Sequence, residues 1–102
     1  MATHGMFLTM VLANAKRQEA RSVVLAVDGP RPRIDMLLLD GSSQALVAPP
    51  ADVLLGIMAS LEAGQRQFSS KVYEANISEV VVQRSVDGVT ARISAWSIEH
   101  CD

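Results

Sequence analysis

The chain has 102 residues, of which 49% are hydrophobic and 20% charged, and its formal net charge is -2 at pH 7. This length suits a single hydrophobic core, so we expect one domain over residues 1–102. The slightly acidic charge argues against non-specific nucleic-acid binding, which needs clustered Lys and Arg.

Cysteine usage and hydropathy indicate a cytoplasmic protein. Cys101 is the only cysteine, so no disulfide can form within one chain. Residues 5–13 are apolar, but no Lys or Arg precedes them, as a signal peptide would require. No stretch approaches the ~20 apolar residues that cross a bilayer. We therefore expect a cytoplasmic location without membrane insertion.

The first half of the chain reads as one helix followed by strands. Apolar side chains recur at helical spacing before a valine-rich run, and valine favours a pleated strand. Gly29-Pro30 and Asp40-Gly41 predict turns between successive strands. The expected elements are a helix over residues 6–19 and strands over residues 22–28, 32–40 and 44–47.

The second half repeats this order. Pro49-Pro50 suits the start of a helix, and Gly64 supplies the left-handed residue that commonly follows a helix end. Asp87-Gly88 predicts a tight hairpin near the end of the chain. The expected elements are a helix over residues 51–63, a link over 65–69 and strands over 71–74, 79–86 and 89–98.

Strands joined by hairpins form antiparallel sheets, and helices then gather on one face. The pattern therefore predicts an α+β fold with five to six antiparallel strands and two helices packed on one face. Its order is helix, two or three strands, helix, two or three strands.

The sharpest candidates for a binding site lie on the second strand. Alternate residues of a strand point to the same side, so Arg33 and Asp35 share a face, which Arg31 joins if the strand begins early enough. A guanidinium group donates paired hydrogen bonds to phosphate or carboxylate, and Asp35 could orient Arg33. Arg92 would lie near them if its strand is adjacent in the sheet. The alternative is a solvated strand face whose ion pairs contribute little.

Other polar and aromatic residues carry simpler interpretations. Glu79 and Arg84 are expected to be surface charges, and Trp96 is expected to pack in the core. The methionines Met6, Met10 and Met58 are expected to fill the core as well.

The residue types that carry catalysis or bind cofactors do not converge in this sequence. A zinc site needs three or four ligands, whereas His4 and His100 lie at opposite ends of the chain. No phosphate-binding loop of the Walker type or dinucleotide fingerprint is present, and His scarcity makes acid–base catalysis improbable. We expect no enzyme activity, no metal and no cofactor.

Three short segments resemble the N-terminal domain of bacterial type II secretion and type IV pilus ATPases. Val11-Leu12 with Ala15 and Ala20 is similar to the opening of that domain. Arg31-Pro32-Arg33-Ile34-Asp35 occupies its Arg-x-Arg-x-Asp strand, and Ala91-Arg92-Ile93-Ser94 is similar to its last strand. The resemblance implies a PAS-like sheet and docking on a motor subunit, with Arg31 and Arg33 directed at bound nucleotide phosphates and Asp35 orienting them.

The chain departs from the family pattern at two places. Residues 21–24 replace an acidic and histidine-containing motif, and Met36 replaces a glycine. We therefore expect a non-catalytic protein-interaction domain that keeps the docking surface and binds a motor subunit or a second copy of itself. The alternatives are a PAS-like sensory module with a small-molecule pocket between helices and sheet, and a small acidic dimeric secretion chaperone.

Overall fold

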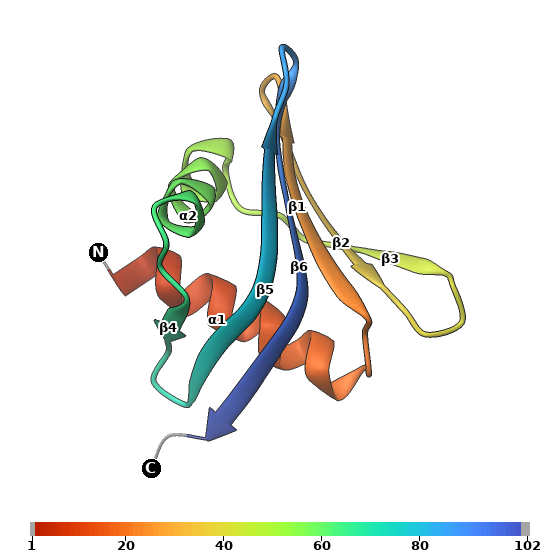
Figure 1. Cartoon of the computed structure of the whole chain (residues 1–102), viewed down its shortest axis with the longest axis vertical. Helices are drawn as coiled ribbons and strands as arrows, with labels where there is room; N and C mark the ends of the chain where they lie inside the picture. Colours follow the sequence, from red (N-terminus) through yellow and green to blue (C-terminus); the bar gives the residue numbers. More distant parts are fainter. Residues whose placement is uncertain (1, 101–102) are drawn as a thin grey trace.

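In the computed structural model, two helices and six strands alternate along the chain, and the description covers the backbone of residues 2–100 and the side chains of residues 5–100. The strands form one antiparallel sheet in the order β3-β2-β1-β6-β5-β4, and both helices lie on the same face of it (Figure 1). The predicted α+β fold is confirmed. The elements are α1 (Ala2–Arg17), β1 (Ser22–Asp28), β2 (Arg31–Leu37), β3 (Ser43–Leu46), α2 (Ala51–Glu62), β4 (Gln67–Ser69), β5 (Tyr73–Arg84) and β6 (Gly88–His100).

The sheet joins two meanders, each of which follows a helix. Strands β1 and β6 pair at the centre, so the turns after β1 and after β5 lie side by side (Figure 1). The backbone N–H of Gly29 donates to the carbonyl of Asp87 across these turns at 2.9 Å. A Cβ at Gly88 would clash with the carbonyl oxygen of Val27, which explains why a residue without a side chain stands there.

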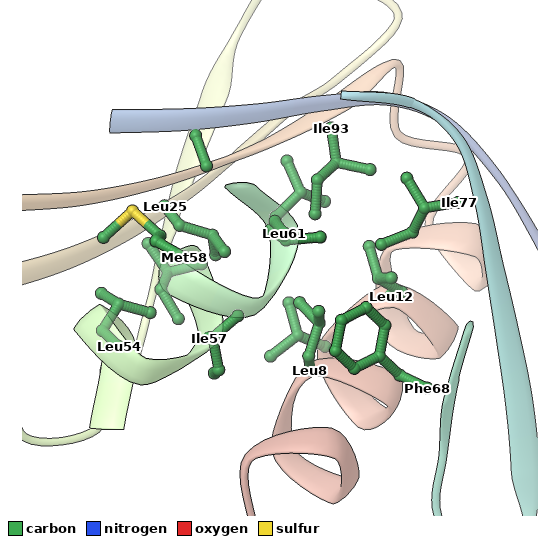
Figure 2. Packing of buried hydrophobic residues seen from close by; sticks show 14 of the residues in the cluster. Leu8, Leu12, Leu25, Leu54, Ile57, Met58, Leu61, Phe68, Ile77 and Ile93 are labelled. Carbon is green, nitrogen blue, oxygen red and sulfur yellow. The ribbon is translucent and has the colours of Figure 1, made fainter. Parts of the chain in front are cut away.

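The core lies between the helices and the covered face of the sheet (Figure 2). Both helices present apolar residues at i, i+3, i+4 and i+7, the spacing of a single helical face. The strands contribute alternate residues, since every second side chain points towards the helices. The central residues are Leu8, Val11, Leu12 and Ala15 of α1, Leu54, Ile57, Met58 and Leu61 of α2, and Val23, Leu25, Ile34, Met36, Ala91 and Ile93 of the sheet.

The methionine prediction was correct for Met58 and wrong for two others. Met6 is 39% exposed and Met10 is 44% exposed, whereas Met58 is buried. Helix α1 packs through the stripe that contains Leu8 and Leu12, so the neighbouring position 10 turns away from the core. Thr9 is buried instead, and its hydroxyl donates to the carbonyl of Gly5 at 2.6 Å.

Several predicted boundaries differ from the structure. The link expected over residues 65–69 contains strand β4, which places Phe68 in the core. The two strands expected over 71–74 and 79–86 are the single strand β5, because pairing with β6 continues past an irregularity between Ile77 and Glu79. Strand β2 ends at Leu37 instead of residue 40, since Asp40 accepts hydrogen bonds from Ser42 within the next turn.

Helix ends also shift by a few residues. Helix α1 ends at Arg17, two residues before the predicted end, and Glu19 adopts a left-handed conformation with φ of 58°.

Within the described part of the chain, neither helix has the length and apolar character needed to cross a membrane.

Candidate functional site

The face of the sheet opposite the helices is uncovered, and we call it the open face (Figure 1). Register and alternation assign its residues, because paired residues of neighbouring strands point to the same side. The open face comprises Ser22, Val24, Ala26 and Asp28 of β1, Arg31, Arg33, Asp35 and Leu37 of β2, Val81 and Gln83 of β5, and Thr90, Arg92 and Ser94 of β6.

All four predicted site residues lie on this face. Arg33 and Asp35 share it as predicted, and β2 begins at Arg31, so the first arginine joins them. Arg92 pairs with Val24, and Val24 pairs with Asp35 on its other side. Two strand spacings separate the backbones of Arg92 and Asp35, which is about 10 Å.

Arg33 is held in place by two carboxylates. Its Nε atom lies 3.0 Å from Oδ2 of Asp35, and its Nη1 atom lies 3.6 Å from Oδ2 of Asp28. The pairing of Arg33 with Asp35 agrees with the prediction from strand alternation. Because the Arg33 side chain is 56% exposed, these pairs contribute less than about 1 kcal/mol each to stability. Their main effect is to fix the direction of the guanidinium group.

The remaining arginines of this region carry no acidic partner. Among residues 5–100, no ion pair joins Arg21, Arg31 or Arg92 to a carboxylate. All three are exposed, as Arg33 is, but only Arg33 has carboxylate partners. Unpaired cations on a shared surface are available to an external anion.

Arg92 also borders two hollows of the open face. One hollow, of about 500 Å³, is lined by Arg21, Ser22, Leu37, Arg92 and Ser94, and we call it the arginine depression. The other, of about 400 Å³, lies towards the turns of the sheet and is lined by Arg92 with Val24, Val81, Gln83 and Thr90.

Ser22 is an unusual member of the arginine depression. Its side chain is only 5% exposed, and its Oγ atom has no hydrogen-bond partner among the described residues. Buried hydroxyl groups are normally hydrogen-bonded, because leaving one unpaired costs free energy. Sequence reasoning missed Arg21 and Ser22, and the only available signal was a polar residue at the start of a valine-rich strand.

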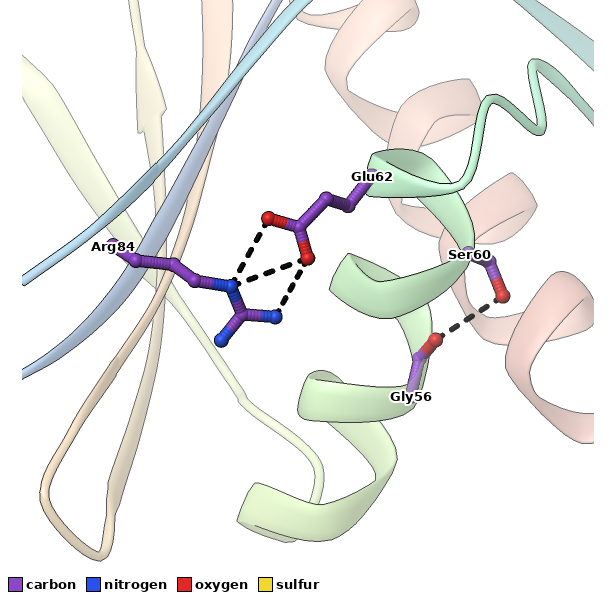
Figure 3. A network of polar contacts seen from close by, with 4 residues as sticks. All are labelled: Gly56, Ser60, Glu62 and Arg84. Carbon is purple, nitrogen blue, oxygen red and sulfur yellow. Dashed lines mark hydrogen bonds and ion pairs between the residues drawn. The ribbon is translucent and has the colours of Figure 1, made fainter.

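Arg84 has a structural role that the sequence did not reveal. Its guanidinium lies on the helix side of β5 and contacts both carboxylate oxygens of Glu62 in α2, with Nη2 at 2.7 Å from Oε1 and Nε at 3.0 Å from Oε2 (Figure 3). These hydrogen bonds from Arg84 lower the pKa of Glu62, and the same contact raises the pKa of Arg84. The pair ties the sheet to a helix and lies away from the open face.

Trp96 is buried, and its predicted place in the core is confirmed. Its Nε1–H donates to the carbonyl of Leu12 at 3.1 Å. The Lys16 Nζ atom donates to the Trp96 carbonyl at 2.9 Å and lies 5.3 Å from the ring centroid. Glu79, expected to be a plain surface charge, accepts a hydrogen bond from Ser94 at 2.7 Å.

In the described part of the chain, no three His, Cys, Asp or Glu side chains gather as metal ligands. The histidine at position 100 stacks edge-on against Tyr73, with ring centroids 5.5 Å apart. Cys101 and the side chain of His4 lie outside the described residues.

A scan against protein-family models finds none that matches the chain, and a search of curated proteins finds no significant match. The resemblance to secretion and pilus ATPases stays a prediction.

Proposed function

We propose that this chain is a non-catalytic protein-interaction domain that docks through the open face of its sheet. Its partner would be a motor subunit of a secretion or pilus machine, as the resemblance implies. The observation that carries the proposal is the gathering of Arg31, Arg33, Asp35 and Arg92 on one face that no helix covers.

The charge pattern of this face suits a protein surface of mixed charge. Arg31, Arg33 and Asp35 lie at alternate positions of β2, while the partly exposed Val24 and the exposed Val81 supply apolar surface beside them. Complementary charges on a partner would accelerate encounter and set the register of docking. Arg33 is already oriented by Asp28 and Asp35, so little side-chain entropy is lost on binding.

The packing of the core argues against the sensory alternative. A small-molecule pocket between helices and sheet would need free space there, but buried side chains such as Leu12, Leu25, Ile57 and Ile93 fill that layer (Figure 2). A ligand would have to displace close-packed groups, at a cost of several kcal/mol for each large side chain moved.

The decisive experiment reverses charge on the open face. The variant carries Arg31→Glu and Arg33→Glu, and the matched control carries Arg17→Glu and Lys71→Glu, two exposed cations elsewhere on the surface. Affinity for a purified secretion or pilus ATPase motor subunit is measured by surface plasmon resonance, and self-association is measured by sedimentation velocity.

Docking through the open face predicts at least about a tenfold loss of affinity in the open-face variant and less than about a threefold loss in the control. The melting temperature of the variant should fall by less than about 4 °C, because only exposed ion pairs are removed. Equal affinities of the two variants would refute the proposal. A concentration-dependent dimer abolished by the same reversal would identify a second copy as the partner.

A further inference from the structure

The arginine depression has the features of a small-molecule site and shares only Arg92 with the proposed docking residues. Two unpaired guanidinium groups border it, from Arg21 and Arg92, together with the buried hydroxyl of Ser22. We propose that it binds the phosphate group of a small phosphorylated molecule.

The donors available in the depression suit a tetrahedral oxyanion. Each arginine offers a planar fork of N–H groups, and Ser22, which lines the depression, carries a buried hydroxyl that has no partner. A phosphate has acceptor oxygens in several directions and a charge near -2, whereas one arginine alone satisfies a planar carboxylate. A bound phosphate would also supply the hydrogen bond that Ser22 lacks.

The charges around the depression do not cancel the two arginines. Asp35 lies one strand beyond Val24 and is already paired with Arg33. Glu79 accepts the hydrogen bond of Ser94 and does not line the depression. The residues that line the depression therefore carry two positive charges and no negative charge.

The size of the depression leaves room for more than the phosphate. Its volume of about 500 Å³ falls within the range of roughly 300–1,000 Å³ that is typical of small-molecule sites. Leu37 lines it beside Ser22 and offers an apolar contact to an organic group. A phosphate ester should thus bind more tightly than inorganic phosphate.

This site is separate from the docking residues of β2. Arg31 and Arg33 lie towards the turn between β1 and β2, whereas Ser22 and Leu37 form the opposite end of the same strand pair. Charge reversal at Arg31 and Arg33 should leave phosphate binding within about threefold of the wild type, since only screened long-range charge changes. The two proposals therefore fail independently.

The test is a titration of the full chain with inorganic phosphate, phenyl phosphate and acetate at constant ionic strength. Backbone amide chemical shifts are followed by NMR for the wild type and three variants. Arg92→Gln and Ser22→Ala alter the site, while Arg17→Gln removes one exposed charge that lies outside the depression. Arg21→Gln replaces Arg92→Gln if the latter lowers the melting temperature.

Saturable shifts at Arg21, Ser22 and Arg92 are expected with both phosphates, and phenyl phosphate should bind several times more tightly. Arg92→Gln should weaken binding about tenfold or more and Ser22→Ala about threefold to tenfold, as loss of charge-assisted and neutral hydrogen bonds respectively. Non-saturable shifts, equal binding of acetate, or an equal loss in Arg17→Gln would each overturn the proposal.

Discussion

Gly88 offers the sharpest test of the central strand pairing. A Cβ on this residue would overlap the carbonyl oxygen of Val27 and lie 3.0 Å from the Val27 carbonyl carbon and 3.2 Å from Cα of Asp28. All three neighbours are backbone atoms, which cannot rotate away as the end of a side chain could. Strands β1 and β6 would have to separate locally by at least about 1 Å in Gly88→Ala.

The cost follows from what that separation disturbs. The Gly29–Asp87 hydrogen bond and the bond from Ser85 N–H to the Gly88 carbonyl lie at the same turns. Weakening two such bonds costs about 1 kcal/mol each, and the remaining strain adds about 1–2 kcal/mol. We expect Gly88→Ala to lower the free energy of unfolding by about 3–4 kcal/mol and the melting temperature by roughly 15–20 °C.

Urea denaturation followed by circular dichroism measures this loss, and Gly29→Ala is the matched control. Gly29 stands in the adjacent turn with φ of 59°, but nothing lies within 4 Å of an added Cβ. Its substitution should cost only about 1 kcal/mol, from the left-handed backbone. A loss in Gly88→Ala no greater than in Gly29→Ala would refute the close approach of the two strands.

Three further outcomes are expected. The Arg84 contact holds the pKa of Glu62 below its ordinary value of 4.5, so its stabilisation is present above that pH and disappears as pH falls. The urea midpoints of the wild type and Glu62→Gln should therefore differ at pH 7 and converge as the pH falls below the lowered pKa of Glu62. Trp96→Phe removes the hydrogen bond to the Leu12 carbonyl and should lower the free energy of unfolding by about 1–2 kcal/mol in the same assay. Its effect on the free energy of binding through the open face should be smaller. In the absence of phosphate, Ser22→Ala should leave the free energy of unfolding unchanged or raise it by up to about 1 kcal/mol, because a buried unpaired hydroxyl is removed. A large loss of stability would indicate that the Ser22 hydroxyl has a hydrogen-bond partner.

Local patterns predicted the type of most elements. The prediction of a strand over residues 22–28 was correct, because β-branched residues favour strands and Gly29-Pro30 makes a turn that ends the strand. Strand β4 escaped prediction because three residues carry too little pattern. It forms through pairing with β5 and through burial of Phe68 against the core.

The candidate site likewise has one part that the sequence predicted and one part that only the sheet pairing decided. Strand alternation was enough to place Arg33 beside Asp35, since both lie on one element. The position of Arg92 depended on whether its strand is adjacent in the sheet, and the pairing of β1 with β6 decided it. The arginine depression depends on the same pairing and on the end of β1, so no local pattern pointed to Arg21 and Ser22.

The sequence by itself determined which segments form helices and strands, where the hairpins lie, and that the charged residues of β2 occupy alternate positions on one side. These features depend on neighbouring residues and backbone preferences. Only the tertiary structure decided which strands meet and which face of the sheet the helices leave open. Burial of both helices against the same face leaves the other to solvent, and pairing of β1 with β6 joins residues far apart in the chain. That long-range pairing turns separate arginines into one surface.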